Sequence, residues 1–306
     1  MRYRSLGNTG LKVSEITLGT VELGMDYGFK GGAHFAKPDR ADCVRVVLRA
    51  LERGINCIDT ARAYGEAESV VGQALRQAGE RPVVCTKLAL TGDTRPADVH
   101  ASIDASLREL GLAEVDVLQI HSATAASLAN EDAIGALMDA QRSGKARFVA
   151  ASVYTEAEAL AAADRGWLRS IQVPFNMLDQ TMADRVLPAA AAAGSGVLVR
   201  SAFLRGVLTP NLDATPAPLA PLRDAARRAL AIHGAGVDGL ASLALRFCLS
   251  FPAVSSVIVG VSSTAEVDAN VDAAEAGPWP AETLARRGEF AVREAIASPA
   301  NWTGLI

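Results

Sequence analysis

Residues 83–121, VVCTKLALTGDTRPADVHASIDASLRELGLAEVDVLQIH, decide the fold. A short apolar run stands at each end, and between them apolar residues recur at helical spacing. Pro96 suits the first turn of a helix behind a possible Thr94 cap, and Gly111 suits its end. A strand, a helix and a second strand in this order predict a parallel βαβ unit.

The same alternation runs through the whole chain. Eight β-rich runs, most of them almost continuously apolar like strands covered on both faces, occupy residues 16–20, 57–60, 83–87, 115–120, 147–153, 170–175, 196–203 and 254–260. Eight such units without a low-complexity linker favour a closed barrel over an open doubly wound sheet. We therefore predict an α/β fold, a (β/α)8 TIM barrel, with residues 1–306 as a single domain.

Segments outside this regular pattern complete the prediction. Residues 1–15 predict a β-hairpin that plugs the N-terminal end of the barrel, and residues 277–306 predict a C-terminal helical tail packed outside it. Long segments follow the first and seventh strands, at residues 21–39 and 204–221. Because active sites of such barrels lie at the C-terminal ends of the strands, we expect these two segments to build the site.

Composition excludes several classes of protein. Thirty basic residues against thirty-four acidic ones give a net charge of -4, so we expect no nucleic-acid partner. No apolar run approaches the ~20 residues that cross a bilayer, and the N-terminus lacks a secretory apolar region. The four cysteines show neither CxxC spacing nor a zinc pattern, which predicts reduced core thiols and no metal. We expect a cytoplasmic protein without a membrane partner.

One stretch imitates a nucleotide-binding motif. Residues 234–239, GAGVDG, match GxGxxG by letter. That fingerprint has to follow a strand and open a helix, whereas this stretch follows the predicted helix 222–232. We interpret it as a loop between two helices.

Polar residues follow three consecutive predicted strands. Asp59, Lys87 and His121 end the second, third and fourth strands, and Tyr64 follows Asp59 in a short loop. Adjacent strands of a barrel would bring all four to one rim, where Asp59 and Lys87 would pair. The Lys87 cation would lower the pKa of the Tyr64 phenol and make it a proton donor, and His121 would polarise a carbonyl.

Each of the four residues also has a structural interpretation when taken alone. The aspartate can cap a helix, the lysine can be a rim charge, the tyrosine can pack, and the histidine can hold a structural hydrogen bond. Their occurrence at consecutive strand ends favours a site over four coincidences. A barrel lyase with Lys87 as Schiff base and Asp59 as its partner is a further alternative.

The sequence resembles the aldo-keto reductases from residue 2 to about residue 270. The resemblance rests on RSLGNTGL at 4–11, NCIDTARAYG at 56–65, TK at 86–87 and DVLQIH at 116–121. It implies a barrel that uses NADPH or NADH without a Rossmann domain. Hydride would pass between the nicotinamide and a carbonyl or alcohol. It also implies that Asp59, Tyr64, Lys87 and His121 are the catalytic tetrad, with Tyr64 as general acid and base.

The resemblance implies a set of cofactor-binding residues as well. They are Gly19, Thr20, Asp59, Ser152, Gln172, Arg200, Ser201, Phe203, Gly260, Ser262, Glu266 and Asn270. Val153 replaces the asparagine that usually accompanies Ser152, which removes one amide contact. Arg200 replaces an aromatic residue that often stacks on the nicotinamide. Its guanidinium can stack there, bind an anionic or polyol substrate, or pair with a neighbouring acid.

The residues at the end of the last predicted strand and just after it predict the cofactor preference. NADPH-preferring relatives often carry a lysine at the position of Gly260 and an arginine near Glu266, and this chain has neither. A carboxylate repels a phosphate but accepts hydrogen bonds from a free ribose diol. We expect NAD to bind at least as well as NADP, although Ser262 and Ser263 can still contact a phosphate.

The substrate is predicted only by class. Tyr27, Phe29, His34 and Phe35 lie in the long first loop and either line a pocket or pack locally; Tyr27, Tyr64 and His121 form the predicted substrate-binding set. An aromatic content of 5% favours a small polar carbonyl or alcohol, such as a sugar or hydroxylated aldehyde. The alternative function is a cofactor-binding interaction or redox-sensor module with little turnover, as in potassium-channel auxiliary subunits of the family.

Overall fold

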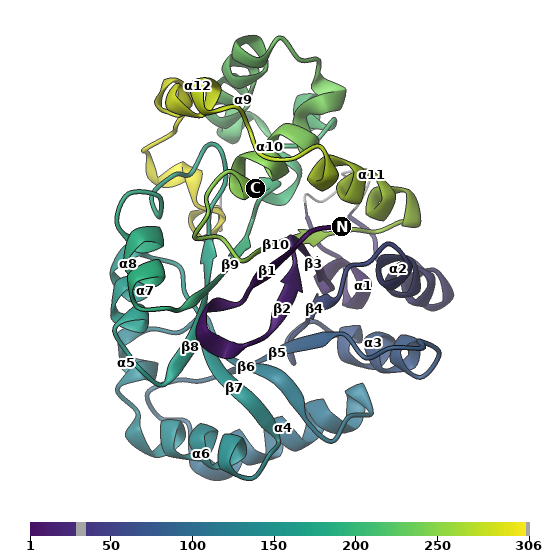
Figure 1. The fold of residues 1–306 in the computed structure, drawn as a ribbon, viewed down its shortest axis with the longest axis vertical. Coiled ribbons are helices and arrows are strands. Elements are labelled where there is room, and N and C mark those ends of the chain that lie inside the picture. The colour runs from purple at the N-terminus through teal and green to yellow at the C-terminus, as the bar shows by residue number, and fades with distance from the viewer. Residues whose placement is uncertain (29–34, 304–306) are drawn as a thin grey trace.

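The computed structural model describes residues 1–28 and 35–303. Eight parallel strands close into a barrel in the order β10-β3-β4-β5-β6-β7-β8-β9, and helices surround it (Figure 1). The strands are β3 (Ile16–Gly19), β4 (Cys57–Asp59), β5 (Val83–Ala89), β6 (Val115–His121), β7 (Ala146–Ser152), β8 (Leu168–Pro174), β9 (Gly196–Arg200) and β10 (Ser256–Gly260). The predicted (β/α)8 barrel is confirmed.

Helices follow the strands along the chain and cover the outside of the barrel (Figure 1). They are α1 (Val21–Gly24), α2 (Arg40–Glu52), α3 (Ala67–Leu75), α4 (Pro96–Leu110), α5 (Ala125–Leu128), α6 (Glu131–Arg142), α7 (Glu156–Ala163), α8 (Val186–Ala192), α9 (Ala220–His233), α10 (Leu240–Leu249), α11 (Thr264–Glu275) and α12 (Ala281–Ala285).

Helix α4 begins and ends as its sequence predicts, with one correction. Pro96 is its first residue, and Gly111 ends it in the left-handed conformation at φ 67°. Thr94 is not its cap, because Arg95 takes that position without a side-chain hydrogen bond. The Thr94 hydroxyl instead accepts a hydrogen bond from the Thr91 N–H at 2.8 Å, which closes the preceding turn.

The N-terminal hairpin closes the bottom of the barrel, as predicted. Strands β1 (Tyr3–Ser5) and β2 (Lys12–Ser14) pair antiparallel. Buried apolar side chains from the hairpin and the barrel interior form one cluster, consisting of Leu6, Leu11, Val13, Cys57, Cys85, Val117, Ala150 and Leu198. At Gly7, with φ +50°, a Cβ would lie 2.3 Å from the Gly196 nitrogen, so only glycine allows this close approach to β9.

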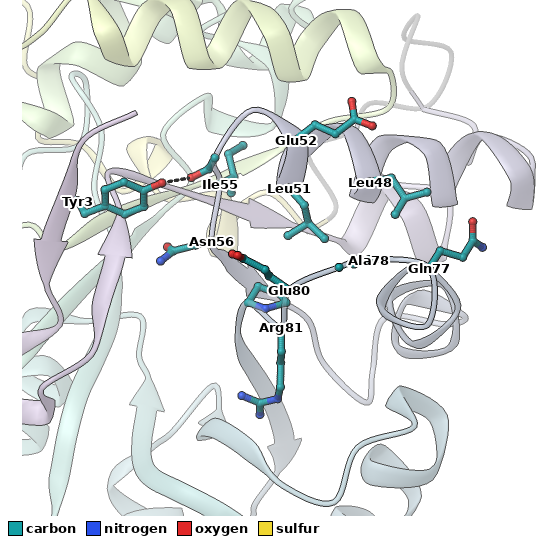
Figure 2. Close-up of a pocket in the computed structure, with 13 residues that line it drawn as sticks. Tyr3, Leu48, Leu51, Glu52, Ile55, Asn56, Gln77, Ala78, Glu80 and Arg81 are labelled. Atoms are coloured by element: carbon teal, nitrogen blue, oxygen red, sulfur yellow. Dashed lines mark hydrogen bonds between the residues drawn. The ribbon is translucent and has the colours of Figure 1, made fainter.

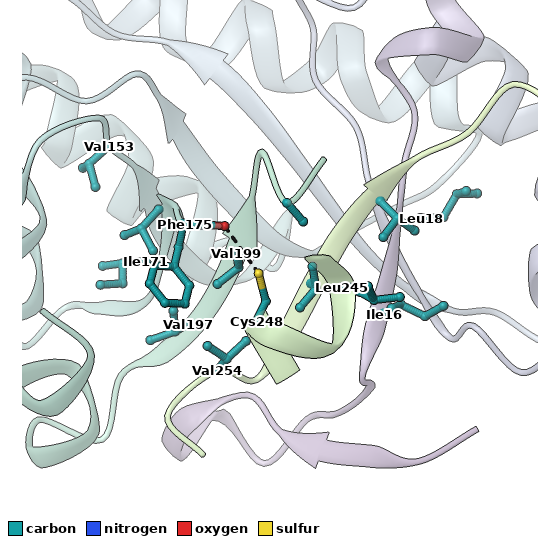
Figure 3. Close-up of a cluster of buried hydrophobic side chains, with 14 of the residues drawn as sticks. Ile16, Leu18, Val153, Ile171, Phe175, Val197, Val199, Leu245, Cys248 and Val254 are labelled. Atoms are coloured by element: carbon teal, nitrogen blue, oxygen red, sulfur yellow. Dashed lines mark hydrogen bonds between the residues drawn. The ribbon is translucent and has the colours of Figure 1, made fainter. Parts of the chain in front are cut away.

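A larger apolar core lies between the barrel and its helices. Outward-facing strand residues such as Ile16 and Val199 pack against α10, where Leu245 and Cys248 are fully buried (Figure 3). The Cys248 thiol lies 3.5 Å from the carbonyl oxygen of Phe175. All four cysteines are buried free thiols, as predicted.

The C-terminal tail differs from the predicted helix. Prolines and glycines interrupt it, so α12 spans five residues and is followed by 3-10 turns up to Asn301. The tail is nevertheless anchored, since Phe290 and Trp302 are buried. Residues 234–239 lie between α9 and α10, so this match to GxGxxG is a loop between two helices, as predicted, and not a dinucleotide-binding fingerprint.

Candidate active site

The four predicted catalytic residues converge at the C-terminal rim of the barrel. Asp59 ends β4, Lys87 lies near the end of β5 and His121 ends β6. These strands are hydrogen-bonded neighbours, so their ends meet at one edge. Tyr64 lies in the loop after β4, and its ring meets the His121 ring edge-on with centroids 5.5 Å apart.

The Asp59–Lys87 ion pair lies at the centre of this group. Lys87 Nζ lies 2.5 Å from Asp59 Oδ2 and donates to the Thr60 carbonyl at 3.0 Å. Both side chains are buried, so each charge compensates the other where water does not. Burial lowers the pKa of Lys87, but attraction to Asp59 and Tyr64 more than reverses this, and the pKa lies above its ordinary value. The ammonium form is therefore retained.

The second oxygen of Asp59 is held by two amides. Gln119 Nε2 and Gln172 Nε2 each donate to Asp59 Oδ1 at 2.9 Å. The Ser152 hydroxyl donates to Gln172 Oε1 at 3.3 Å. Gln119 is a site residue that the sequence analysis missed, although a glutamine inside the apolar run of β6 marks an inward-facing polar position.

The pKa of Tyr64 moves in the opposite direction to the one expected. Burial raises it above its ordinary value and outweighs the lowering effect of Lys87. The expected lowering was wrong because burial disfavours phenolate and Asp59 neutralises much of the lysine charge. Lys87 Nζ still lies 3.4 Å from the Tyr64 hydroxyl. The phenol therefore keeps its proton at neutral pH.

His121 is neutral in the same conditions. Burial lowers its pKa to about 4, and the nearby Lys87 and Arg200 cations add to this effect. A neutral imidazole presents one N–H donor and one acceptor nitrogen. It can therefore orient a carbonyl or hydroxyl oxygen beside Tyr64 without adding a charge.

Unusual backbone conformations gather in the loops at this rim. Among the described residues, the four non-glycine positions with positive φ are Ser122, Ser201, Leu204 and Arg205. Ser122 directly follows β6, and the other three belong to the loop after β9. Such conformations cost about 1–3 kcal/mol each and are typical of functional sites.

A second group of predicted residues forms the β3–β10 side of the rim. Gly19 ends β3 beside Gly260, which ends β10, and Thr20 donates its hydroxyl hydrogen to the Asp59 carbonyl at 3.1 Å. Asn270 is buried in α11. Glu266 Oε2 accepts from the Ser262 N–H at 2.7 Å, at the N-terminal end of α11.

These residues fit an elongated dinucleotide. A helix N-terminus with hydroxyl side chains favours phosphate oxygens. The buried amide and hydroxyl of Gln172 and Ser152 suit a carboxamide. The residues at the β3–β10 side and the Gln172–Ser152 pair are thus both compatible with a bound dinucleotide.

Glu22 is a second residue that the sequence analysis missed. Its Oε2 is buried and has no hydrogen-bond partner within the described parts of the chain. Its carboxyl packs directly against Gly260, where a Cβ would lie 2.0 Å from Glu22 Oε1. Burial raises the pKa of Glu22 to about 7, and repulsion from Glu266 contributes. No local pattern in the sequence marks it.

One cationic side chain, that of Arg45, also lies on the β3–β10 side of the rim, although not at the positions of Gly260 and Glu266, where NADPH-preferring relatives often carry a lysine and an arginine. Arg45 of α2 lines a cavity of about 220 Å³ together with Ser262 and Ser263. Its guanidinium pairs with Asp42 of the same helix.

The remaining predicted residues lie at the end of β9 and in the segments that follow β3 and β9. Arg200 ends β9, Ser201 and Phe203 follow it, and Val153 follows β7. In the first loop, the Tyr27 N–H donates to the Phe35 carbonyl at 2.9 Å. Phe29 and His34 lie outside the described residues.

Comparisons with known proteins identify the family. The profile of the Aldo/keto reductase family matches residues 15–290. The chain belongs to this family. It is accordingly an enzyme, an NAD(P)-dependent oxidoreductase of small carbonyl compounds.

Individual relatives match most of this aldo/keto reductase. It is 32% identical over 290 residues to an L-galactose dehydrogenase of Arabidopsis thaliana, covering 89% of this chain and 88% of the relative. It is 31% identical over 317 residues to a probable voltage-gated potassium channel subunit beta of the same plant, covering 91% and 92%. The holo structure of a Bacillus halodurans aldo-keto reductase superposes with a TM-score of 0.79 at 26% identity, covering 96% and 97%.

A surface cavity of about 560 Å³ in this aldo/keto reductase lies away from the rim. It is lined by the segments that lead into β4 and β5, including Ile55, Asn56 and Arg81, together with Tyr3 of the hairpin (Figure 2). It therefore belongs to the N-terminal end of the barrel, opposite the tetrad.

Two structural findings concern other classes of site. Across residues 1–28 and 35–303, no cluster of three or more histidine, cysteine, aspartate or glutamate side chains is arranged to hold a metal ion. None of the helices in the same ranges has the length and apolar character needed to span a membrane.

Proposed function

We propose that this aldo/keto reductase interconverts a small polar carbonyl compound, such as a sugar or hydroxylated aldehyde, and its alcohol, with Tyr64 as general acid and base. The contact that carries the proposal is Lys87 Nζ to the Tyr64 hydroxyl at 3.4 Å, with Asp59 2.5 Å from the same ammonium. When bound, the nicotinamide supplies or accepts the hydride.

The chain's own residues handle the proton. In the reducing direction, the Tyr64 hydroxyl gives its proton to the substrate oxygen, and the adjacent Lys87 ammonium stabilises the phenolate that remains. Neutral His121 donates a hydrogen bond to the same oxygen and directs it toward Tyr64. Asp59 holds the ammonium in place. In the oxidising direction, the phenolate accepts the proton of the alcohol.

The preference for a polar substrate has two supports. The L-galactose dehydrogenase that resembles this chain acts, by its name, on a sugar. The loops at the C-terminal rim also carry Tyr27, Arg200 and Arg205, whose hydroxyl and guanidinium groups suit hydroxylated compounds.

We also propose that NAD binds at least as well as NADP. Two carboxyl groups, Glu22 and Glu266, flank Gly260 at the predicted cofactor end, and the Arg45 cation is already paired with Asp42. A 2′-phosphate there meets like charge, whereas a ribose diol finds acceptors. Steady-state kinetics with both cofactors test this, and a hundredfold NADP preference contradicts it.

The decisive experiment is a panel of sugars, aldehydes and alcohols followed at the nicotinamide absorbance with each cofactor. Turnover of a hydroxylated carbonyl or its alcohol supports the proposal. The alternative, a cofactor-binding interaction or redox-sensor module, is favoured by the resemblance to the potassium channel subunit. It predicts tight cofactor binding with almost no turnover across the panel.

We further propose that residues 1–306 act as one domain in the cytoplasm. Four buried free thiols support a reducing compartment.

A further inference from the structure

Arg200 places a half-buried positive charge at the C-terminal rim of the barrel, where β9 ends. Its guanidinium donates to the Val153 carbonyl at 3.0 Å and to the Ser201 hydroxyl at 3.4 Å, and it stacks 4.1 Å from the centre of the Tyr154 ring. All these partners are neutral. Within the described ranges no carboxylate forms an ion pair with it, and Asp59, whose charge does act on it, is paired with Lys87. Arginine stays protonated even when partly buried, so this charge is left without a carboxylate in direct contact.

Electrostatic effects show that Arg200 acts on the site. Its charge contributes to lowering the pKa of His121. Burial lowers the pKa of Arg200 itself, and Tyr154, Tyr64, Tyr27 and Asp59 oppose this change. The guanidinium therefore lies within electrostatic range of Tyr64 and His121.

A second arginine extends the positive surface outward. The Arg205 guanidinium lies 5.5 Å from the centre of the Tyr27 ring and 6.0 Å from that of Trp302. Arg205 is exposed and has a positive φ of 52°. The end of β9 and the turn after it thus carry two guanidinium groups, one half-buried and one exposed.

We propose that Arg200, assisted by Arg205, binds an anionic group of the substrate, so that the enzyme acts on hydroxylated carbonyl compounds or alcohols that carry a carboxylate or a phosphate. The inference rests on the proposed function, because it places the reacting oxygen at Tyr64. An oxyanion supplies the directly bound counter-charge that Arg200 lacks, and a planar guanidinium can bind either group through two hydrogen bonds.

Matched substrate pairs test the inference. Glucuronate is compared with glucose, and glyceraldehyde 3-phosphate with glyceraldehyde, with each cofactor. We expect the wild type to favour the anionic member of at least one pair by about tenfold or more in kcat/KM. The pair that shows the preference distinguishes a carboxylate from a phosphate ligand.

Variants assign the effect to Arg200. Arg200→Gln is expected to reduce the anionic-to-neutral ratio by about tenfold, mostly through KM, while Arg200→Lys keeps part of it because the charge remains. Arg169→Gln removes an exposed arginine near the start of β8, at the other end of the barrel, and is expected to leave the ratio within about twofold.

Specific results would overturn the inference. One is a wild-type ratio near or below one for both pairs. Another is an Arg200→Gln variant that weakens both members equally and also raises the Kd for NADH measured by fluorescence, which would assign Arg200 to the cofactor. If the wild type bound neither cofactor and reduced no compound, the proposed function would fail together with the inference.

Discussion

The Lys87 ammonium lies 3.4 Å from the Tyr64 hydroxyl and 4.9 Å from the centre of the Tyr64 ring. This contact joins a partly exposed phenol to a fully buried cation, because Lys87 itself has no exposed surface. Burial keeps the proton on the phenol, and the ammonium stabilises the phenolate once the proton has left. The same arrangement therefore serves proton donation and proton recovery.

Tyr64→Phe is expected to lower kcat for carbonyl reduction by about 10³-fold, since the general acid is lost while the ring is kept. Cofactor affinity is expected to remain within about threefold, because the hydroxyl has no role in the proposed cofactor contacts. Stopped-flow hydride transfer and NADH fluorescence titration measure the two effects. A turnover number close to that of the wild type would contradict the proton-donor role.

Asp59→Asn is expected to destabilise the fold by about 3–5 kcal/mol, since it leaves the buried Lys87 cation without its counter-charge. The matched control is Asp98→Asn, which breaks an exposed pair with Arg95 and is expected to cost about 1 kcal/mol or less. Urea unfolding of both variants measures the difference. Equal losses of unfolding free energy in the two variants would mean that the buried ion pair stabilises the fold no more than the exposed one.

His121 is expected to stay neutral throughout pH 5–8, because burial lowers its pKa to about 4. Its contribution to stability is present above the ordinary pKa of the unfolded histidine and is lost as pH falls toward 4. Imidazole NMR signals, assigned with His121→Asn, measure the titration. A His121 signal with a midpoint near pH 6.5 would refute the neutral role.

Leu6→Ala is expected to destabilise the protein by about 2–5 kcal/mol, because it empties part of the plug beneath the barrel. Lys12→Ala, an exposed change in the same hairpin, is expected to cost about 0.5 kcal/mol or less. Thermal and urea unfolding compare them. If the two variants unfold alike, the hairpin does not contribute to the barrel core.

The fold and the tetrad could be predicted because each rests on a local pattern. Apolar runs mark strands covered on both faces, and Asp59, Lys87 and His121 mark their ends. Glu22 could not be predicted, since its importance comes from a contact with Gly260, which lies 238 positions further along the chain. The pKa of Tyr64 was predicted in the wrong direction because the sequence shows a neighbouring cation but not the extent of burial.

Glu22→Gln is expected to weaken the pH dependence of cofactor selection. The pKa of Glu22 is raised to about 7, so its carboxyl is mostly neutral at pH 6 and mostly ionised at pH 8.5. Repulsion of a 2′-phosphate therefore grows as pH rises, and the ratio of Kd for NADPH to Kd for NADH is expected to rise about threefold or more across this range in the wild type. The glutamine variant, which keeps the shape without the charge, is expected to show a smaller rise, because only the second ionisation of the phosphate remains. Glu80→Gln, an exposed change at the opposite end of the barrel, serves as the control and is expected to behave like the wild type. Fluorescence titrations of the reduced cofactors give both constants, and an unchanged rise in Glu22→Gln would show that another group governs the discrimination.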